Sequence, residues 1–313
     1  MTTNGPARAS GHPDYSSGST AGFIPQVWSG KLIEKLYKST VFGEIANTDY
    51  EGEIKSQGDT VKIRTVPSIT IRDYEIGGSL TYETPASDMV ELQIDRAKYF
   101  AFKCDNVDRH QSDLKLMDDW SEDGGQQMKI AIDGTILGEV YADAAAENAG
   151  ASAGKESGDI NLGATGAPVT ITKDNILDVL VDTATVLDEQ NVPDTQRYIV
   201  IPSWMAGMLK KSELRDASIM GDGTSAFRNG RLGMLDRYTV YTSNNLSKTT
   251  DGTDNVTNVI FGHKKALTFA AQMTEMDTLK AESFFGNLVR GLNVFGFKTI
   301  DPNAMGHLYA VKG

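Results

Sequence analysis

The chain has 313 residues, of which 40% are hydrophobic and 31 are glycines, so a sizeable core is possible and wholesale disorder is excluded. With 30 Lys and Arg against 42 Asp and Glu, the net charge is −12, which argues against a nucleic-acid reader and against adhesion to anionic lipid. The single cysteine, Cys104, excludes an internal disulfide and a cysteine-rich metal site within one chain. No apolar run approaches the ~18–20 residues of a membrane span, and the first residues lack the apolar stretch of a secretory signal.

The N-terminal region is predicted to be an arm. Residues 1–22 are rich in Gly, Ser, Thr and Pro and bury too little surface to offset the entropy of ordering, so the composition predicts mobility. Order is predicted to begin at four apolar residues, Phe23, Ile24, Val27 and Trp28. Val41, Phe42 and Ile45 follow as further apolar anchors.

Residues 51–100 are predicted to be β-structure. Alternation of apolar and polar side chains predicts strands over 61–66, 69–74 and 89–95, and residues 99–102 extend the region. Pro67-Ser68 predicts a turn and Gly77-Gly78 a reversal. A long hairpin with so few large apolar residues has a weak core of its own, so its stability should come from packing on another surface.

A long helix is predicted over residues 113–149, because apolar residues recur three or four apart and acidic residues crowd its N-terminal end. Gly124-Gly125 predicts a bend within it. Residues 150–168 are rich in Gly, Ala and Ser and predict a linker or surface loop at a domain boundary.

The rest of the chain mixes helices and strands without a repeated βαβ unit, which predicts the α+β class. Helices are expected from a cap at Thr172 to Leu187 and over 204–209. Strands are expected over 198–201, 238–241, 255–261, 266–273, 281–300 and 306–311.

The residues typical of catalysis, cofactor binding or metal binding form no recognisable pattern. The four histidines, His12, His110, His263 and His307, have no metal-ligand spacing, and phosphate loops and a nucleophile elbow are absent from the sequence. Cys104 is interpreted as a small buried apolar residue. The acidic segment 251–255 has the composition of a surface turn. No catalytic, cofactor or metal residue is therefore predicted.

Several segments, taken in their order along the chain, carry a resemblance to a known family. They are Gly58-Asp59-Thr60-Val61 with Arg72-Asp73-Tyr74, then Tyr198-Ile199-Val200-Ile201-Pro202, then Gly230-Arg231-Leu232-Gly233-Met234-Leu235-Asp236 leading into Val240-Tyr241-Thr242-Ser243-Asn244-Asn245-Leu246. From about Pro25 to the C-terminus, the chain resembles the major capsid protein of tailed bacteriophages, the Hong Kong phage-type fold that encapsulin nanocompartments share.

The resemblance implies an α+β chain with an N-terminal arm, an extended β-hairpin loop, a long spine helix, and peripheral and axial domains. In this sequence these parts would be the arm at 1–48, the extended loop at 49–87, the peripheral domain with spine helix and linker at 88–168, the axial domain at 169–260, and strands at 261–313 that return to the peripheral domain and close the axial domain.

The resemblance also implies a function. The chain would assemble in the host cytoplasm into hexamers and pentamers of an icosahedral virion head enclosing double-stranded DNA, without enzymatic activity, cofactor or membrane. A separate scaffolding protein, a portal and a decoration protein would be partners, and packaged DNA would be contacted non-specifically. Contacts between subunits are expected at the arm and loop residues Phe23, Ile24, Val27, Trp28, Arg64, Ile69, Ile71, Arg72 and Tyr74.

Two alternatives remain at this stage. One is an encapsulin-like shell protein, which shares the fold but usually lacks so long a polar N-terminal arm. The other is an enzyme whose catalytic residues carry no recognisable motif.

Overall fold

The computed structural model of the chain describes residues 38–49, 60–64, 67, 69–85, 89–105, 116–212, 233–235, 237–281 and 285–313. The helices in these ranges are α1 (Phe42–Ile45), α4 (Leu116–Glu139), α5 (Ile176–Glu189), α6 (Ser203–Lys211) and the short 3-10 helices η2 (Val140–Asp143), η3 (Ala146–Asn148) and η6 (Pro302–Ala304). The strands of the same ranges form a two-stranded ribbon, a three-stranded sheet and a seven-stranded sheet.

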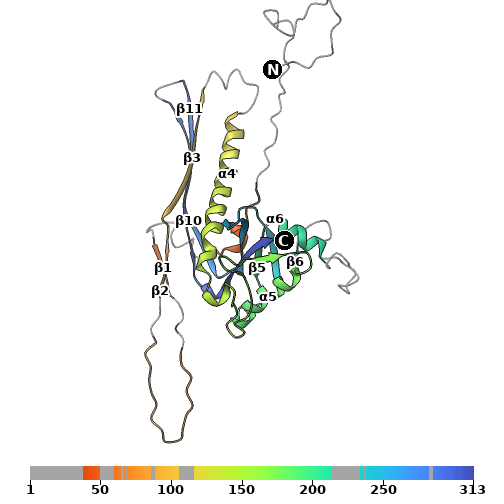
Figure 1. The fold of residues 1–313 in the computed structure, drawn as a ribbon. Coiled ribbons are helices and arrows are strands. Elements are labelled where there is room, and N and C mark those ends of the chain that lie inside the picture. Colours follow the sequence, from red (N-terminus) through yellow and green to blue (C-terminus); the bar gives the residue numbers. More distant parts are fainter. Residues whose placement is uncertain are drawn as a thin grey trace, which may run out of the picture.

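The three-stranded sheet and α4 form an elongated part of the molecule, in which the helix lies beside the strands (Figure 1). The antiparallel strands are β10 (Leu267–Lys280), β11 (Gly286–Thr299) and β3 (Arg96–Asp105), in that order. Phe100 lies between the two layers, since a Cβ added to Gly124 of α4 would come within 2.9 Å of its ring and one added to Gly291 of β11 would also collide with it. Phe102 packs edge-on against Trp120 of α4, with 5.7 Å between ring centroids.

The seven-stranded sheet forms the compact part of the molecule, together with α5 and α6 (Figure 1). Its strands are β4 (Val169–Ile171), β12 (Met305–Lys312), β9 (Asp254–His263), β5 (Arg197–Ile201), β7 (Tyr238–Thr242) and β6 (Met234–Leu235) in spatial order, with β8 (Lys248–Asp251) paired to β9. All five residues of β5 are buried, as expected for a central strand covered on both faces. The strands predicted over 198–201, 238–241, 255–261 and 306–311 and the helix predicted over 204–209 are confirmed.

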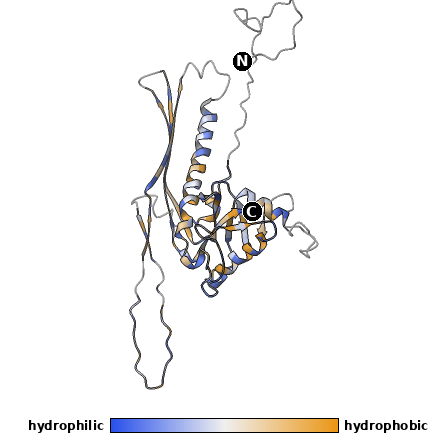
Figure 2. Cartoon of the chain, in the orientation of Figure 1, coloured by the Kyte–Doolittle hydropathy of each residue, from blue (hydrophilic) through white to orange (hydrophobic). Residues whose placement is uncertain are grey.

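One apolar core joins the two parts. It contains Val41 and Ile45 from the N-terminal region, Ile136 of α4, Ile199 of β5 and Phe295 of β11, together with many neighbours. Figure 2 shows hydrophobic segments gathered where α5, β5 and the adjoining strands meet, whereas α4 and the long strands beside it carry mixed colours. The predicted apolar anchors at 41–45 are confirmed, because Ile45 is fully buried.

The predicted linker or surface loop at 150–168 is a surface loop that a few buried residues anchor in this core. Ala153 and Leu162 are fully buried, and the backbone N–H of Tyr309 donates to the Leu162 carbonyl at 2.8 Å. Glycines supply the tight reversals, with positive φ at Gly150 and Gly163. The glycines that suggested a linker therefore form close turns against β12.

The strand predicted over 69–74 is wrong. The ribbon pairs β1 (Thr60–Arg64) with β2 (Met89–Gln93), whereas residues 69–85 between them have extended or turn backbone without strand pairing. The reason is the location of apolar support, since Ile63 and Leu92 are buried beside the body while the side chains farther out contact no covering surface within the described residues.

The predicted long helix ends earlier than expected. α4 runs through Gly124 and Gly125 without interruption and stops at Glu139, after which the chain continues in the two 3-10 helices η2 and η3. Gly124 makes room for Phe100 rather than breaking the helix. Thr172 and Asn175 exchange hydrogen bonds in the reciprocal pattern of a capping box, which supports the predicted cap, and α5 itself begins at Ile176.

The two adjacent glycines of α4 should respond to the same substitution with opposite signs. Gly124→Ala should lower the free energy of unfolding, because overpacking against Phe100 costs about 1–3 kcal/mol and outweighs the helix propensity of alanine. Gly125→Ala meets no atom within 4 Å of its new Cβ and should raise stability by up to about 1 kcal/mol. Urea unfolding of the purified variants measures the two changes. Equal changes in the free energy of unfolding would contradict the close packing of Phe100 against Gly124.

Candidate functional site

Groups that could perform chemistry are few within the described part of the chain. No cluster of three His, Cys, Asp or Glu side chains there could hold a metal ion. His307 is largely buried, with 2.9 Å between its Nε2 and Asn258 Oδ1, and Cys104 is buried as predicted. The segment 251–254 is the hairpin turn between β8 and β9. His12 and His110 lie outside the described residues. In the ranges described, no helix combines the length and the apolar character needed to cross a membrane.

Residues 69–85, the outer part of the predicted loop 49–87 and called the extended loop from here on, project far from the body (Figure 1). Large apolar side chains along both of its arms are exposed, with 91% of Ile71 and 99% of Ile76 accessible to solvent. The others are Ile69, Tyr74, Leu80 and Tyr82. Gly77, with φ of +86°, forms the turn at the tip. Contiguous exposed apolar groups of this kind mark interaction surfaces rather than the surface of an isolated chain.

Few contacts hold the two arms of the extended loop to one another. The backbone N–H of Thr70 donates to Glu83 Oε1 at 2.7 Å, and Arg72 lies 4.0 Å from the same carboxylate. The loop therefore presents extended backbone and apolar side chains together.

The predicted contact residues fall into two groups. Ile69, Ile71, Arg72 and Tyr74 all lie on the extended loop, and Arg64 is exposed at the end of β1 beside it. The arm residues Phe23, Ile24, Val27 and Trp28 lie outside the described residues. The sequence analysis missed Ile76, Leu80 and Tyr82. The signal for them in the sequence is the alternation of apolar and polar side chains in Leu80-Thr81-Tyr82.

The loop leaves the body at a defined point. At the base of the ribbon, Ile63 and Leu92 pack with Ile94 and Ala270 in a small second core. Gly296 of β11 lies so close to the Gln93 carbonyl that any Cβ would collide with it. The ribbon therefore crosses β11 in direct contact with its backbone.

An ion pair lies beside this crossing. Arg96, the first residue of β3, donates to both carboxylate oxygens of Glu139 at 2.7 and 2.6 Å, and its guanidinium lies 4.4 Å from the centroid of the Phe297 ring. The hydrogen bond from Arg96 lowers the pKa of Glu139, and the same bond raises the pKa of Arg96. Because both side chains are partly exposed, the pair orients the ribbon more than it stabilises the fold.

The face of the three-stranded sheet away from α4 is a second candidate surface. Phe100 and Phe102 face the helix, so the alternating residues Tyr99 and Ala101 face outward. With cross-strand neighbours they line a shallow hollow formed by Tyr99, Ala101, Glu275, Asp277, Arg290 and Leu292. Tyr99 is 79% exposed, and Arg290 donates to Asp277 at 2.9 Å.

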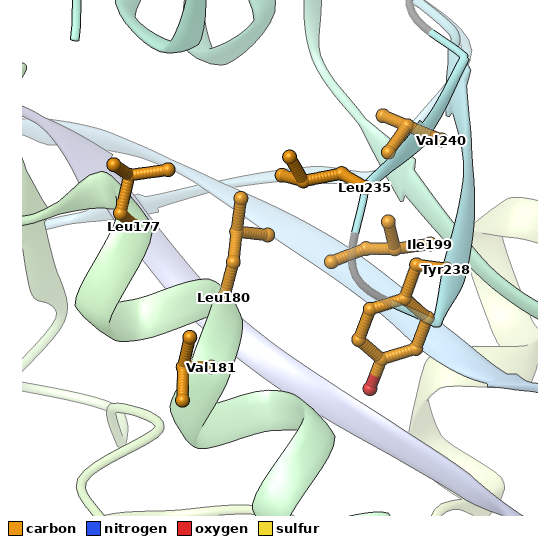
Figure 3. A pocket seen from close by; sticks show the side chains of 7 residues that line it. All are labelled: Leu177, Leu180, Val181, Ile199, Leu235, Tyr238 and Val240. Carbon is orange, nitrogen blue, oxygen red and sulfur yellow. The ribbon is translucent and has the colours of Figure 1, made fainter. Parts of the chain in front are cut away.

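An apolar pocket opens in the compact part, between α5 and the end of the seven-stranded sheet. Figure 3 shows the side chains of α5 facing those of β5, β6 and β7 across it. The lining residues are Leu177, Leu180, Val181, Ile199, Leu235, Tyr238 and Val240. Polar groups that could orient a small ligand are few among these side chains.

Acid should weaken the fold through His307. Burial lowers the pKa of this imidazole to about 4, whereas an unfolded histidine titrates near about 6.5. The unfolded chain therefore binds a proton that the folded chain excludes, so stability should fall between about pH 6.5 and pH 4, by up to about 3 kcal/mol.

Urea unfolding at several pH values, compared between the wild type and His307→Gln, isolates this contribution from the carboxylates. The wild type should lose more stability than the variant as the pH falls. Parallel pH profiles would show that His307 is protonated as readily in the folded chain as in the unfolded one.

Comparison with known proteins bears on these surfaces. The family model for phage capsid protein matches residues 92–308, which is more than half of the chain. A solved chain from Mycobacterium phage Che8 has 27% sequence identity and a TM-score of 0.75, with 93% of this chain and 97% of that chain covered. None of the curated proteins compared with the sequence matches it.

Two further solved structures share the fold at lower identity. The capsid of the Cyanophage P-SCSP1u has 17% identity and a TM-score of 0.69, with 97% of this chain and 98% of that chain covered. The capsid of Ralstonia phage GP4 has 14% identity and a TM-score of 0.63, with 98% and 97% covered. The expected α+β capsid fold is thus confirmed, and the family match favours a phage shell over the encapsulin-like alternative. The chain belongs to the phage capsid protein family and is a major capsid protein of a tailed bacteriophage, located in the shell of the virion.

Proposed function

We propose that this capsid protein forms hexamers and pentamers that close into an icosahedral head around double-stranded DNA, and that the extended loop reaches over a neighbouring subunit within each ring. The observation that carries the proposal is the exposure of Ile71, Ile76 and Tyr82 on a loop that packs on nothing else in the described chain. Burial of one such side chain contributes about 1.5–3 kcal/mol, so this loop gains its stability on contact with a sister molecule.

The parts of the chain would divide the work of assembly. Residues 1–48 form an arm that contacts neighbours, and 49–87 form the reaching loop. Residues 88–168 and 261–313 supply the peripheral part around α4, and 169–260 form most of the axial domain around the ring axes. Arg64, Ile69, Ile71, Arg72 and Tyr74 on the loop side, with Phe23, Ile24, Val27 and Trp28 on the arm, make the contacts between subunits.

The outward face of the three-stranded sheet is the surface best suited to receive a neighbour's loop. It offers exposed aromatic and aliphatic groups around Tyr99 and the paired charges of Asp277 and Arg290. The loop carries complementary features, with exposed isoleucines beside Arg72 and Glu83. Each such contact is small, and repetition around a closed ring gives the shell its strength.

Other components complete the head in this proposal. A net charge of −12 suits a wall that encloses DNA and contacts it without specificity or tight adhesion. A separate scaffolding protein directs assembly, a portal occupies one vertex, and a decoration protein binds the outer surface. The protein has a structural role and no enzymatic one.

Removal of the exposed apolar groups tests the loop. The triple variant Ile71→Ser, Ile76→Ser, Tyr82→Ser should fold with an unchanged melting temperature, because these side chains are exposed in the isolated chain. The concentration of unassembled subunit in equilibrium with shells should rise by roughly tenfold or more, since each ~1.4 kcal/mol of lost contact energy is a factor of ten.

The matched control replaces exposed polar residues of the same loop, Ser79→Ala and Thr81→Ala, and should assemble normally. Electron microscopy and sedimentation of particles formed in host cells that produce the remaining head proteins give the measurement, and nuclease treatment followed by DNA extraction tests the enclosed DNA. If the triple variant forms normal shells, the extended loop makes no contact that assembly needs.

A further inference from the structure

A buried carboxylate lies where the N-terminal segment joins the body. Asp133, in the second half of α4, is fully inaccessible to solvent. Its Oδ1 accepts hydrogen bonds from the backbone N–H groups of Val41 and Phe42, both at 2.9 Å. Its Oδ2 accepts one from the side-chain amide of Asn245 at 2.7 Å. Three neutral donors thus satisfy one buried anion, an arrangement that is costly to rearrange because an unsatisfied buried charge is strongly unfavourable.

Asn245 belongs to the loop that follows β7, and this loop also holds the segment just before α1. The Asn245 amide contacts the Ser39 carbonyl at 3.4 Å, and the Ser39 hydroxyl donates to the Thr242 carbonyl at 3.0 Å. The backbone N–H of Asn245 donates to the Ser243 hydroxyl at 3.1 Å, which fixes the loop itself. Residue 39 is therefore held from both ends of this loop, and Asp133 ties the loop and the segment to α4.

A second fastening lies a few residues further along. Asn47 exchanges backbone hydrogen bonds with β10, through Leu267 and Phe269 at 2.9 Å each, and its side chain accepts one from Thr268 at 2.8 Å. Between the two fastenings, Val41, Ile45 and Ala46 are buried. Because Asn47 fixes the far end of this segment, Asp133 and Asn245 act at its near end, around residues 39–42.

We propose that Asp133 and Asn245 are a positioning pair that sets the direction in which the chain before residue 39 leaves the body, and that shell assembly depends on this direction. The inference rests on the proposed function, in which the arm contacts neighbouring subunits. In that function, the place and angle at which the chain continues from residue 39 limit which neighbouring surfaces the arm can reach. A misdirected arm would leave the subunit folded and unable to close shells.

The chemistry of the pair permits a reciprocal exchange. In Asp133→Asn, the new amide nitrogen faces the amide nitrogen of Asn245, so two donors oppose one another. In Asn245→Asp, two carboxylates oppose one another. In the double variant, Asn at 133 still accepts from Val41 and Phe42 through its oxygen and donates to Asp at 245, which restores the hydrogen bond between the two side chains with the donor and acceptor reversed. The weaker bond to the Ser39 carbonyl, at 3.4 Å in the wild type, stays absent because a carboxylate cannot donate.

The experiment measures the four forms and a matched control, Asn148→Ala. Asn148 is also fully buried and donates to two carbonyl groups, of Asn303 and Met305, and neither bond involves the described N-terminal residues 38–49. Spin labels at Lys38→Cys and Lys248→Cys, with Cys104→Ala, report the direction of departure as a distance distribution. Amide exchange at Val41 and Phe42, melting temperature and shell yield below the lowest melting temperature complete the readouts.

Both single variants should broaden the label distance, raise amide exchange at Val41 and Phe42 at least tenfold, and lower shell yield at least tenfold. The double variant should recover most of each loss, since only the weaker bond to Ser39 stays absent. Asn148→Ala should lower the melting temperature yet assemble normally. Normal assembly of the single variants, or a double variant that restores nothing, would overturn the positioning pair. If wild-type chains form no shells, the proposed function fails, and the label distances still decide whether the pair sets the direction.

Discussion

Burial of one continuous apolar core is the constraint on which the rest of this capsid protein depends. The core takes side chains from the N-terminal segment, from the second half of α4, from the seven-stranded sheet and from the nearer ends of β10 and β11. α4 and the three-stranded sheet of β10, β11 and β3 are each too thin to form a core alone. They bury their apolar side chains against one another and against the compact part. Their shared core therefore makes a rigid body from which the other parts can project.

The bases of the projecting parts are fixed to that body. The ribbon begins where Ile63 and Leu92 join a small core of their own with Ile94, and Arg96 braces the crossing through Glu139. The N-terminal segment is held by Asp133 at one end and by Asn47 at the other. Beyond these bases, the described loop exposes its apolar groups. This division of a rigid body and reaching extensions suits a protein whose remaining burial comes from neighbours in a shell.

Close backbone approach recurs wherever two layers meet. Gly124 and Gly291 make room for Phe100 between helix and sheet, and Gly296 lets the ribbon lie against β11. These positions need glycine for space, which differs from the turn at Gly77, where a positive φ is required. The many glycines of this chain therefore reflect packing as well as flexibility. Residues 150–168, with a composition typical of a linker, form a surface loop that Ala153 and Leu162 anchor in the core.

Local sequence pattern determined much of this protein by itself. The sequence identified the strands at 198–201 and 89–95. A strand buried on both faces has a continuous apolar run, and a strand buried on one face alternates apolar and polar side chains. The order of parts was sufficient to indicate the capsid family. Tertiary structure alone decided which strands pair, where α4 ends, and that residues 69–85 form no strand, because each depends on the presence or absence of a covering surface distant in sequence. Asp133 and Asn245 could not be paired from the sequence, since 112 positions separate them and only the folded core brings the carboxylate and the amide together.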